Sequence, residues 1–449
     1  MFIPAVARQF GSRGVGAYQL STNLVGYFTL FALFGLAPLM VREMAATPSK
    51  LGPLFWRTLS NRLIFSAWAL VGLAVLATAS GYPREIRVLL AVLGVGLVAS
   101  TVVDSAFIVF QAVQRMGLVL GTTVLQVSCY IGLGVLALHA GYGITGLAAA
   151  SSAGVVAQSI AGLVVVCRRF APFPRPFPRL EMRAIIAGGT PFFIATTAVA
   201  VLARIDAYIL SVMVPLRDVG YYLAGYVFLE IALIFPMAGA AAVYPRLTLV
   251  ANSPEADLRA ACAHYYRVVG GLCAWCAAAS VLLAPQMVRL LYGDRFGSSV
   301  AITRIIMVSL VFVAFNTIVG RGIYAAGGQW PLVRVTCIGA AFNIAANVLV
   351  IPSWGIRGAA VVTVATYLLM SAMHWQLAAR YACRPGLLTA LFPLGIFAAA
   401  AGSGLALSSL PAAATFVVTS IVGLGTLGVQ LRVAEGVGAV ALLGGRRSA

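Results

Sequence analysis

Charged side chains inside long apolar segments are the residues of this chain whose types and positions could do chemistry. Glu230 lies near the middle of the apolar segment 219–243, and Asp206 and Asp104 lie within two other apolar segments. An ionisable group in hydrocarbon costs at least about 2.5–3.5 kcal/mol, so such groups mark functional sites. We predict that these carboxylates take up protons or cations. The structural alternatives are a hydrogen bond to a neighbouring helix and, for Asp104, snorkelling or helix capping.

Arginine side chains offer the complementary chemistry, because a guanidinium binds phosphate oxygens through two parallel hydrogen bonds. Arg204 precedes Asp206 by two residues, so the two side chains point in different directions on a helix. A pair between Arg204 and Glu230 is plausible and could be purely structural. Arg304 lies about one turn inside an apolar segment, and Arg42 follows the first long one. These three arginines are candidates for an anion-binding cavity.

Three uncharged polar residues complete the candidate site. Asn343 and Asn347 are one helical turn apart and share a helix face. Hydrogen bonding between helices is the simpler account of this pair, and lining of a cavity is the alternative. Tyr222 lies among several tyrosines and could stack on a sugar, although an aromatic belt at the membrane interface explains it as well.

The elements that must position these residues are transmembrane helices. The chain has 449 residues, of which 61% are apolar and 9% charged, and this excludes a water-soluble protein. Apolar runs of this length without period-2 alternation predict helices rather than barrel strands. The thirteen predicted segments are 17–40, 63–80, 88–110, 117–139, 143–166, 184–214, 219–243, 265–291, 299–320, 330–351, 356–378, 387–409 and 411–431, with a stub at 1–7.

The net charge of +19 comes from basic residues between the apolar segments rather than on one face, which excludes nucleic-acid binding. If the loop after 17–40 is cytoplasmic, most basic loop residues fall on that side, including Lys50, Arg57 and Arg62, as the positive-inside rule requires. A phosphate-binding G-x-x-x-x-G-K-[ST] loop is absent from the sequence, so ATP hydrolysis within the chain is excluded. Cys273 and Cys276 lack further ligands, and we predict no metal and no cofactor.

An internal repeat defines the expected domains. Gly-Val-Gly-Ala-Tyr at 14–18 parallels Asp-Val-Gly-Tyr-Tyr at 218–222, and Gly-Ile-Thr-Gly at 143–146 parallels Gly-Ile-Arg-Gly at 355–358. Two six-helix lobes in parallel repeat around a central cavity follow from this pattern. The repeat offset also implies that the first helix lacks about 20 residues, with the stub as its outer end. The expected parts are an N-terminal lobe at 1–166, a Pro/Arg linker at 167–183, a C-terminal lobe at 184–380, and two further helices with a tail at 381–449.

Six segments carry a resemblance to a known family. They are AVARQFGSRGVGAYQL (5–20), FGLAPLMVRE (34–43), RIDAYILSVMVPLRDVGYYLAGYVFLE (204–230), AAVYPRL (241–247), LYGDRFGSSVAITRI (291–305) and NIAANVLVIPSWGIRGAAVVT (343–363). In these the chain resembles the polysaccharide transporter family, the Wzx-type flippases of the multidrug/oligosaccharidyl-lipid/polysaccharide exporter superfamily. The resemblance implies two six-helix lobes around a cavity. It also implies the movement of an undecaprenyl-diphosphate-linked oligosaccharide across the bacterial inner membrane, by alternating access and without ATP.

Two other functions stay open on the sequence. A small-molecule or drug cation antiporter of the same superfamily needs fewer cations and a carboxylate-centred site, whereas Arg204 and Arg304 beside Glu230 favour the flippase. A membrane glycosyltransferase or polymerase is the enzyme alternative, but the expected outer loops hold few carboxylates. The expected driving force is a proton or sodium gradient or the membrane potential. The expected partners are the lipid-linked substrate, the bilayer, and a polysaccharide polymerase with its export machinery.

Overall fold

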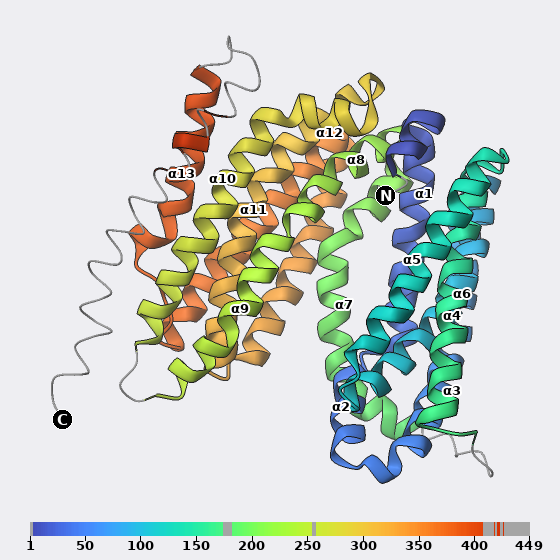
Figure 1. Ribbon diagram of the computed structural model, residues 1–449. Coiled ribbons are helices and arrows are strands. Elements are labelled where there is room, and N and C mark those ends of the chain that lie inside the picture. Colours follow the sequence, from blue (N-terminus) through green and yellow to red (C-terminus); the bar gives the residue numbers. More distant parts are fainter. Residues whose placement is uncertain are drawn as a thin grey trace. The chain divides into compact units, whose positions relative to one another are not determined.

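The computed structural model describes residues 3–173, 182–253 and 257–406, together with 417, 420–422 and 425 (Figure 1). Every regular element in these ranges is helical, which confirms the all-helical class predicted from composition. Nine helical stretches in the described ranges are long and apolar enough to cross a membrane. The chain divides into two compact units, Met1–Gly220 and Tyr221–Ala449. Most of the predicted segment 411–431 and residues 174–181 of the predicted linker lie outside the described residues.

The N-terminal unit contains α1 (Ile3–Leu33), α2 (Ala37–Ala46), the short 3-10 helix η1 (Pro48–Lys50), α3 (Leu51–Ala79), α4 (Arg84–Ala112), α5 (Met116–His139), α6 (Gly143–Arg169) and α7 (Met182–Met213). Helix α4 packs against α1, α3 and α6, and a core of aromatic and aliphatic side chains lies among α2, α3 and α4. Helix α7 packs against α1. Helix α7, which we expected to open the C-terminal lobe, belongs to this compact unit.

The C-terminal unit begins within α8 (Leu216–Ala232). Its further elements are α9 (Ile234–Ala251), α10 (Leu258–Tyr292), the 3-10 helix η2 (Asp294–Phe296), α11 (Gly297–Ala325), α12 (Gln329–Arg380) and α13 (Leu387–Ala406). Helix α11 packs against α9, α10 and α12 and is the most buried membrane-spanning helix described. Helix α13 lies along α10, where Ala278 faces Ala400 and Ala401 and the small side chains allow close packing (Figure 1).

Two predicted segments are divided differently in the structure. The predicted stub 1–7 and segment 17–40 meet in one helix, α1, which kinks at Gly11 with φ 65° and has no loop between its arms. The helix ends at a turn in which Phe34 and Gly35 both have positive φ, so residues 37–40 belong to α2. The predicted segment 219–243 is interrupted at Leu233, because Pro236 cannot donate a backbone hydrogen bond to the preceding turn.

The repeat predicted from the sequence has a counterpart in backbone geometry. Gly143 has φ 62° at the start of α6, and Gly355 has φ 54° at a kink that divides α12 into the predicted segments 330–351 and 356–378. Each of these glycines follows an aromatic residue, Tyr142 or Trp354. A second glycine lies four residues after each aromatic residue, and a Cβ atom added there would meet the Cβ atom of the aromatic residue. These second glycines are Gly146, next to Tyr142, and Gly358, next to Trp354. Both aromatic side chains are exposed, as expected at a membrane interface.

Candidate functional site

A seam of polar side chains lies between α1 and α7 in the N-terminal unit. Gln19, Asn23 and Tyr27 follow one another at four-residue spacing, so they lie on one face of α1. From α7, the Arg204 guanidinium donates a hydrogen bond to the Asn23 Oδ1 atom. Asp206, which is 3% exposed, accepts a backbone hydrogen bond from Ala207 at 2.7 Å. Both α7 charges lie within electrostatic range of the Tyr27 hydroxyl.

Three polar atoms of this α1–α7 seam are buried without a hydrogen-bond partner in the described part of the chain. They are Gln19 Oε1, Asn23 Nδ2 and Tyr27 Oη. A buried polar atom without a partner costs about 1–3 kcal/mol. The seam therefore combines one cation, one carboxylate and unused donors and acceptors, which is the composition of a site for a polar, charged ligand.

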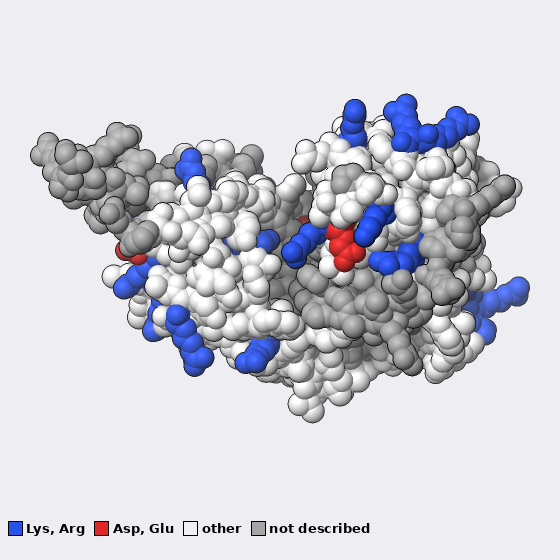
Figure 2. Space-filling view, turned by 90° about the horizontal axis from the view of Figure 1, so that it is seen from below, with Lys and Arg blue, Asp and Glu red and all other residues white. Residues whose placement is uncertain are grey.

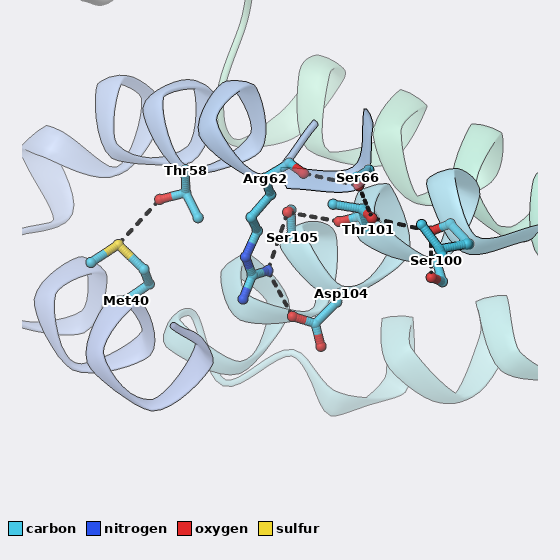
Figure 3. Close-up of polar contacts among 9 residues, drawn as sticks. Met40, Thr58, Arg62, Ser66, Ser100, Thr101, Asp104 and Ser105 are labelled. Atoms are coloured by element: carbon cyan, nitrogen blue, oxygen red, sulfur yellow. Dashed lines mark hydrogen bonds and ion pairs between the residues drawn. The ribbon is translucent and has the colours of Figure 1, made fainter. Parts of the chain in front are cut away.

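Asp104 lies in a second polar group, where α3 meets α4 (Figure 3). The Arg62 Nη1 atom is 2.7 Å from Asp104 Oδ2 and 3.3 Å from Ser105 Oγ. Next to this pair, Ser66 and Thr101 hydroxyls are 2.7 Å apart. The prediction that Arg62 is a loop residue is wrong, because it lies within α3 and is 0% exposed. Asp104 was predicted to take part in ion coupling. In the structure it forms an ion pair with the buried Arg62, which that prediction did not include.

Arg42 lies outside both groups, on an exposed face of α2. With Lys50 and Arg57 it lines a cavity of about 520 Å³ at the corner between α2 and α3. The structure therefore does not gather Arg42 and Arg204 at one place within the N-terminal unit, although both were predicted to bind the same anion.

In the C-terminal unit, α12 brings several predicted residues together. Asn343 Nδ2 donates to Thr366 Oγ1 at 3.1 Å, which joins the two arms of α12 across the kink. Asn347 Nδ2 donates to Asn343 Oδ1 at 3.0 Å. Tyr222 from α8 is fully buried, and its hydroxyl lies 3.4 Å from Thr363 Oγ1, one turn before Thr366. These residues form an interhelical hydrogen-bonded group in which the Tyr222 ring is buried.

The remaining two predicted residues of this unit lie apart from that group. Glu230 on α8 interacts electrostatically with Tyr292 at the end of α10. Arg304 on α11 is exposed and donates from Nε to the Val281 carbonyl at 3.2 Å. The pair predicted between Arg204 and Glu230 would join the two units and stays a prediction.

Residues that the sequence analysis missed include Gln19, Asn23 and Tyr27. The sequence pattern could have identified these three residues, because polar side chains at four-residue spacing in an apolar helix indicate a polar face. Arg62 and Thr366 carried no such signal, since their partners lie on helices or helix arms that only folding brings together.

The fold defines the class of protein, which is a multi-pass helical membrane protein with the fold of transporters of the MOP superfamily. The chain is similar to the lipid II flippase MurJ in its inward closed conformation, with a TM-score of 0.67, 12% identity and coverage of 96% of this chain and 98% of that one. It is also similar to a multidrug resistance MATE family transporter in the inward-facing conformation. There the TM-score is 0.67 at 14% identity, and coverage is 85% of this chain and 94% of that one. A MOP superfamily transporter from Pyrococcus furiosus is similar with a TM-score of 0.59 at 13% identity, covering 85% of this chain and 90% of that one.

The sequence assigns the family within this class. The model of the family described as polysaccharide biosynthesis protein matches residues 1–250, more than half of the chain, and the chain belongs to that family. An uncharacterized membrane protein of Methanocaldococcus jannaschii is 31% identical over 84 residues, which are 19% of this chain. The match spans only 17% of that relative's length.

Proposed function

We propose that the chain is a flippase that moves an undecaprenyl-diphosphate-linked oligosaccharide across the bacterial cytoplasmic membrane for the synthesis of a surface polysaccharide. The observation that carries this proposal is the α1–α7 seam, where Arg204 lies beside unused amide and phenol groups inside a membrane-spanning unit. The family and the superfamily fold support a transporter rather than a glycosyltransferase or polymerase.

The chemistry of the seam matches the headgroup of such a lipid. A diphosphate needs a cation, and the planar guanidinium of Arg204 can bind two phosphate oxygens at once. Sugar hydroxyls both donate and accept hydrogen bonds, as do the side chains of Gln19, Asn23 and Tyr27. Because three polar atoms of these side chains have no partner among the described residues, the headgroup would supply hydrogen bonds that this part of the protein does not make.

The proposed energy source is an ion gradient or the membrane potential. Moving two negative charges outward from a negative interior is downhill by about 2.3 kcal/mol per charge per 100 mV, or roughly 4–5 kcal/mol in all. This is enough to favour the outer leaflet more than about a thousandfold at equilibrium. Alternating access of the two units, without ATP hydrolysis, is the proposed mechanism.

A second candidate, exchange of a small organic cation for protons or sodium ions, is favoured by one observation. Asp206 is an almost fully buried carboxylate in the same seam. Under this alternative Asp206 would be the essential residue, and Arg204 would only hold α1 against α7.

Reconstituted vesicles can separate these functions. A polyprenyl-diphosphate lipid with a fluorescent oligosaccharide is assayed for its exposure to a membrane-impermeant quencher. We expect Arg204→Ala to abolish transfer and Arg204→Lys to leave part of it, because the charge remains without the planar fork. Arg13→Ala, at a residue that is exposed in the same unit, should transfer at the wild-type rate. Full transfer by Arg204→Ala, or transport of a fluorescent organic cation by the wild type without any lipid transfer, would contradict the flippase.

A further inference from the structure

The cavity at the corner between α2 and α3 has a lining that neither the seam nor the fold explains. One face of α2 contributes Leu39, Arg42, Glu43 and Ala46, at the spacing of one helix face. The rest of the wall comes from the end of α2, from η1 and from the first two turns of α3, through Thr47, Lys50, Leu54 and Arg57. The cavity holds about 520 Å³. It combines three cations, one carboxylate and several aliphatic side chains in one concave surface, which we name the α2–α3 cavity.

The cations gather at a point where the backbone also favours an anion. Lys50 is the single lysine of the chain and precedes the first residue of α3, at the positive end of that helix dipole. No side chain caps this helix end. Arg57 lies nearly two turns further along α3, and Arg42 lies opposite on α2. The cationic side chains and the uncapped helix end therefore all attract negative charge to one cavity.

The predicted topology places the α2–α3 cavity at the cytoplasmic surface of the bilayer. The face of the molecule seen from the end at which α2 lies shows many basic and few acidic side chains (Figure 2). Aliphatic residues Leu39 and Leu54 line the cavity beside the cations. Basic pockets between helices at the cytoplasmic interface bind lipid headgroups, because the phosphate meets the cations while the chains remain in hydrocarbon.

We propose that the α2–α3 cavity binds the phosphate headgroup of an anionic lipid at the cytoplasmic interface. This site lies apart from the α1–α7 seam, so the proposal does not depend on what the seam transports. The same phosphate chemistry is offered by a bilayer phospholipid such as phosphatidylglycerol and by a polyprenyl diphosphate before its transfer. Direct binding measurements distinguish these two sources.

The test uses the purified full-length protein in detergent, with lipid binding measured by native mass spectrometry. The probes are phosphatidylglycerol, zwitterionic phosphatidylcholine and undecaprenyl diphosphate. Each cation near a membrane phosphate contributes roughly a fivefold gain in affinity, so the triple variant R42Q/K50Q/R57Q should bind anionic lipid on the order of 100-fold more weakly. Glu43→Gln should instead tighten binding roughly fivefold, a gain that misfolding cannot produce.

A control variant removes two positive charges that lie outside the α2–α3 cavity. Arg168 and Arg169 are exposed at the end of α6, and R168Q/R169Q should bind anionic lipid as the wild type does. Loss of phosphatidylglycerol binding in the triple variant alone would identify a resident phospholipid. If the wild type binds undecaprenyl diphosphate more tightly than phosphatidylglycerol and the triple variant loses this binding, the cavity is a loading site for the polyprenyl diphosphate. Wild-type protein without preference for anionic lipid, or a triple variant equal to R168Q/R169Q, would overturn the proposal.

Discussion

Replacing Asp104 with Asn should destabilise the N-terminal unit more than replacing its partner, Arg62. The Arg62 side chain is 0% exposed and packs between α3 and α4, so the protein encloses its charge. Its Nε and Nη2 atoms already have no partner in the described chain. In Asp104→Asn the amide oxygen and the Ser105 hydroxyl can still accept hydrogen bonds from the guanidinium, but no negative charge compensates it. Removing one partner of a buried ion pair costs about 3–5 kcal/mol.

The reverse substitution should cost less. The Asp104 side chain is 32% exposed and the Arg62 side chain 0%, so the carboxylate left alone by Arg62→Met is less enclosed by protein than the guanidinium left alone by Asp104→Asn. We expect Arg62→Met to lower the free energy of unfolding by about 1–3 kcal/mol, since the Met side chain fills part of the volume. The double variant R62M/D104N should recover most of the loss caused by Asp104→Asn, because no buried charge remains.

Reversible unfolding in mixed detergent micelles gives the free energies for this comparison. The exposed pair between Arg13 and Glu85, at 3.5 Å, is the control, and Glu85→Gln should cost less than about 1 kcal/mol. If Arg62→Met were as costly as Asp104→Asn, or if Asp104→Asn were as mild as Glu85→Gln, the charge-burial reasoning would be refuted.

Two further predictions follow from packing and charge. A Cβ atom on Gly220 would lie 1.8 Å from the Ser12 carbonyl oxygen, so Gly220→Ala should reduce the yield of folded protein in size-exclusion chromatography. Gly26 has no atom within 4 Å of such a Cβ, and Gly26→Ala should elute as the wild type does. A reporter enzyme inserted in 167–183 should be active only in the cytoplasm, and one near Asp294 only outside. Exchanged results would reverse the orientation.

Hydropathy located most membrane helices because charged residues and glycines lie at the ends of their apolar runs. The predictions 117–139 and 143–166 agree closely with α5 and α6. The prediction 63–80 placed the start of its helix too late. Helix α3 begins at Leu51, and its first part contains two arginines that the hydropathy criterion rejected. Hydropathy treats each charge as exposed and cannot register a partner on another helix. The ion pair that buries Arg62 was therefore invisible to it.

Prediction of the candidate site has the same limit, because the sequence does not show which residues meet across two helices. The bond between Asn343 and Asn347 joins residues one turn apart, so helical spacing was enough to place them on one face. The contacts of Arg204 with Asn23 and of Tyr222 with Thr363 join helices distant in sequence. Residue type indicated that Arg204 and Tyr222 were candidates, but only the packing of α1, α7, α8 and α12 identified their partners.

Leaflet transfer under an imposed membrane potential tests the central claim most directly. Purified protein is reconstituted in nucleotide-free vesicles with a polyprenyl-diphosphate oligosaccharide, and a potassium gradient sets the sign of the potential. We predict protein-dependent transfer that carries the lipid toward the positive side, and slower transfer when the potential is collapsed. Transfer no faster than in protein-free vesicles, or transfer that appears only after ATP is added, would contradict a flippase driven without ATP.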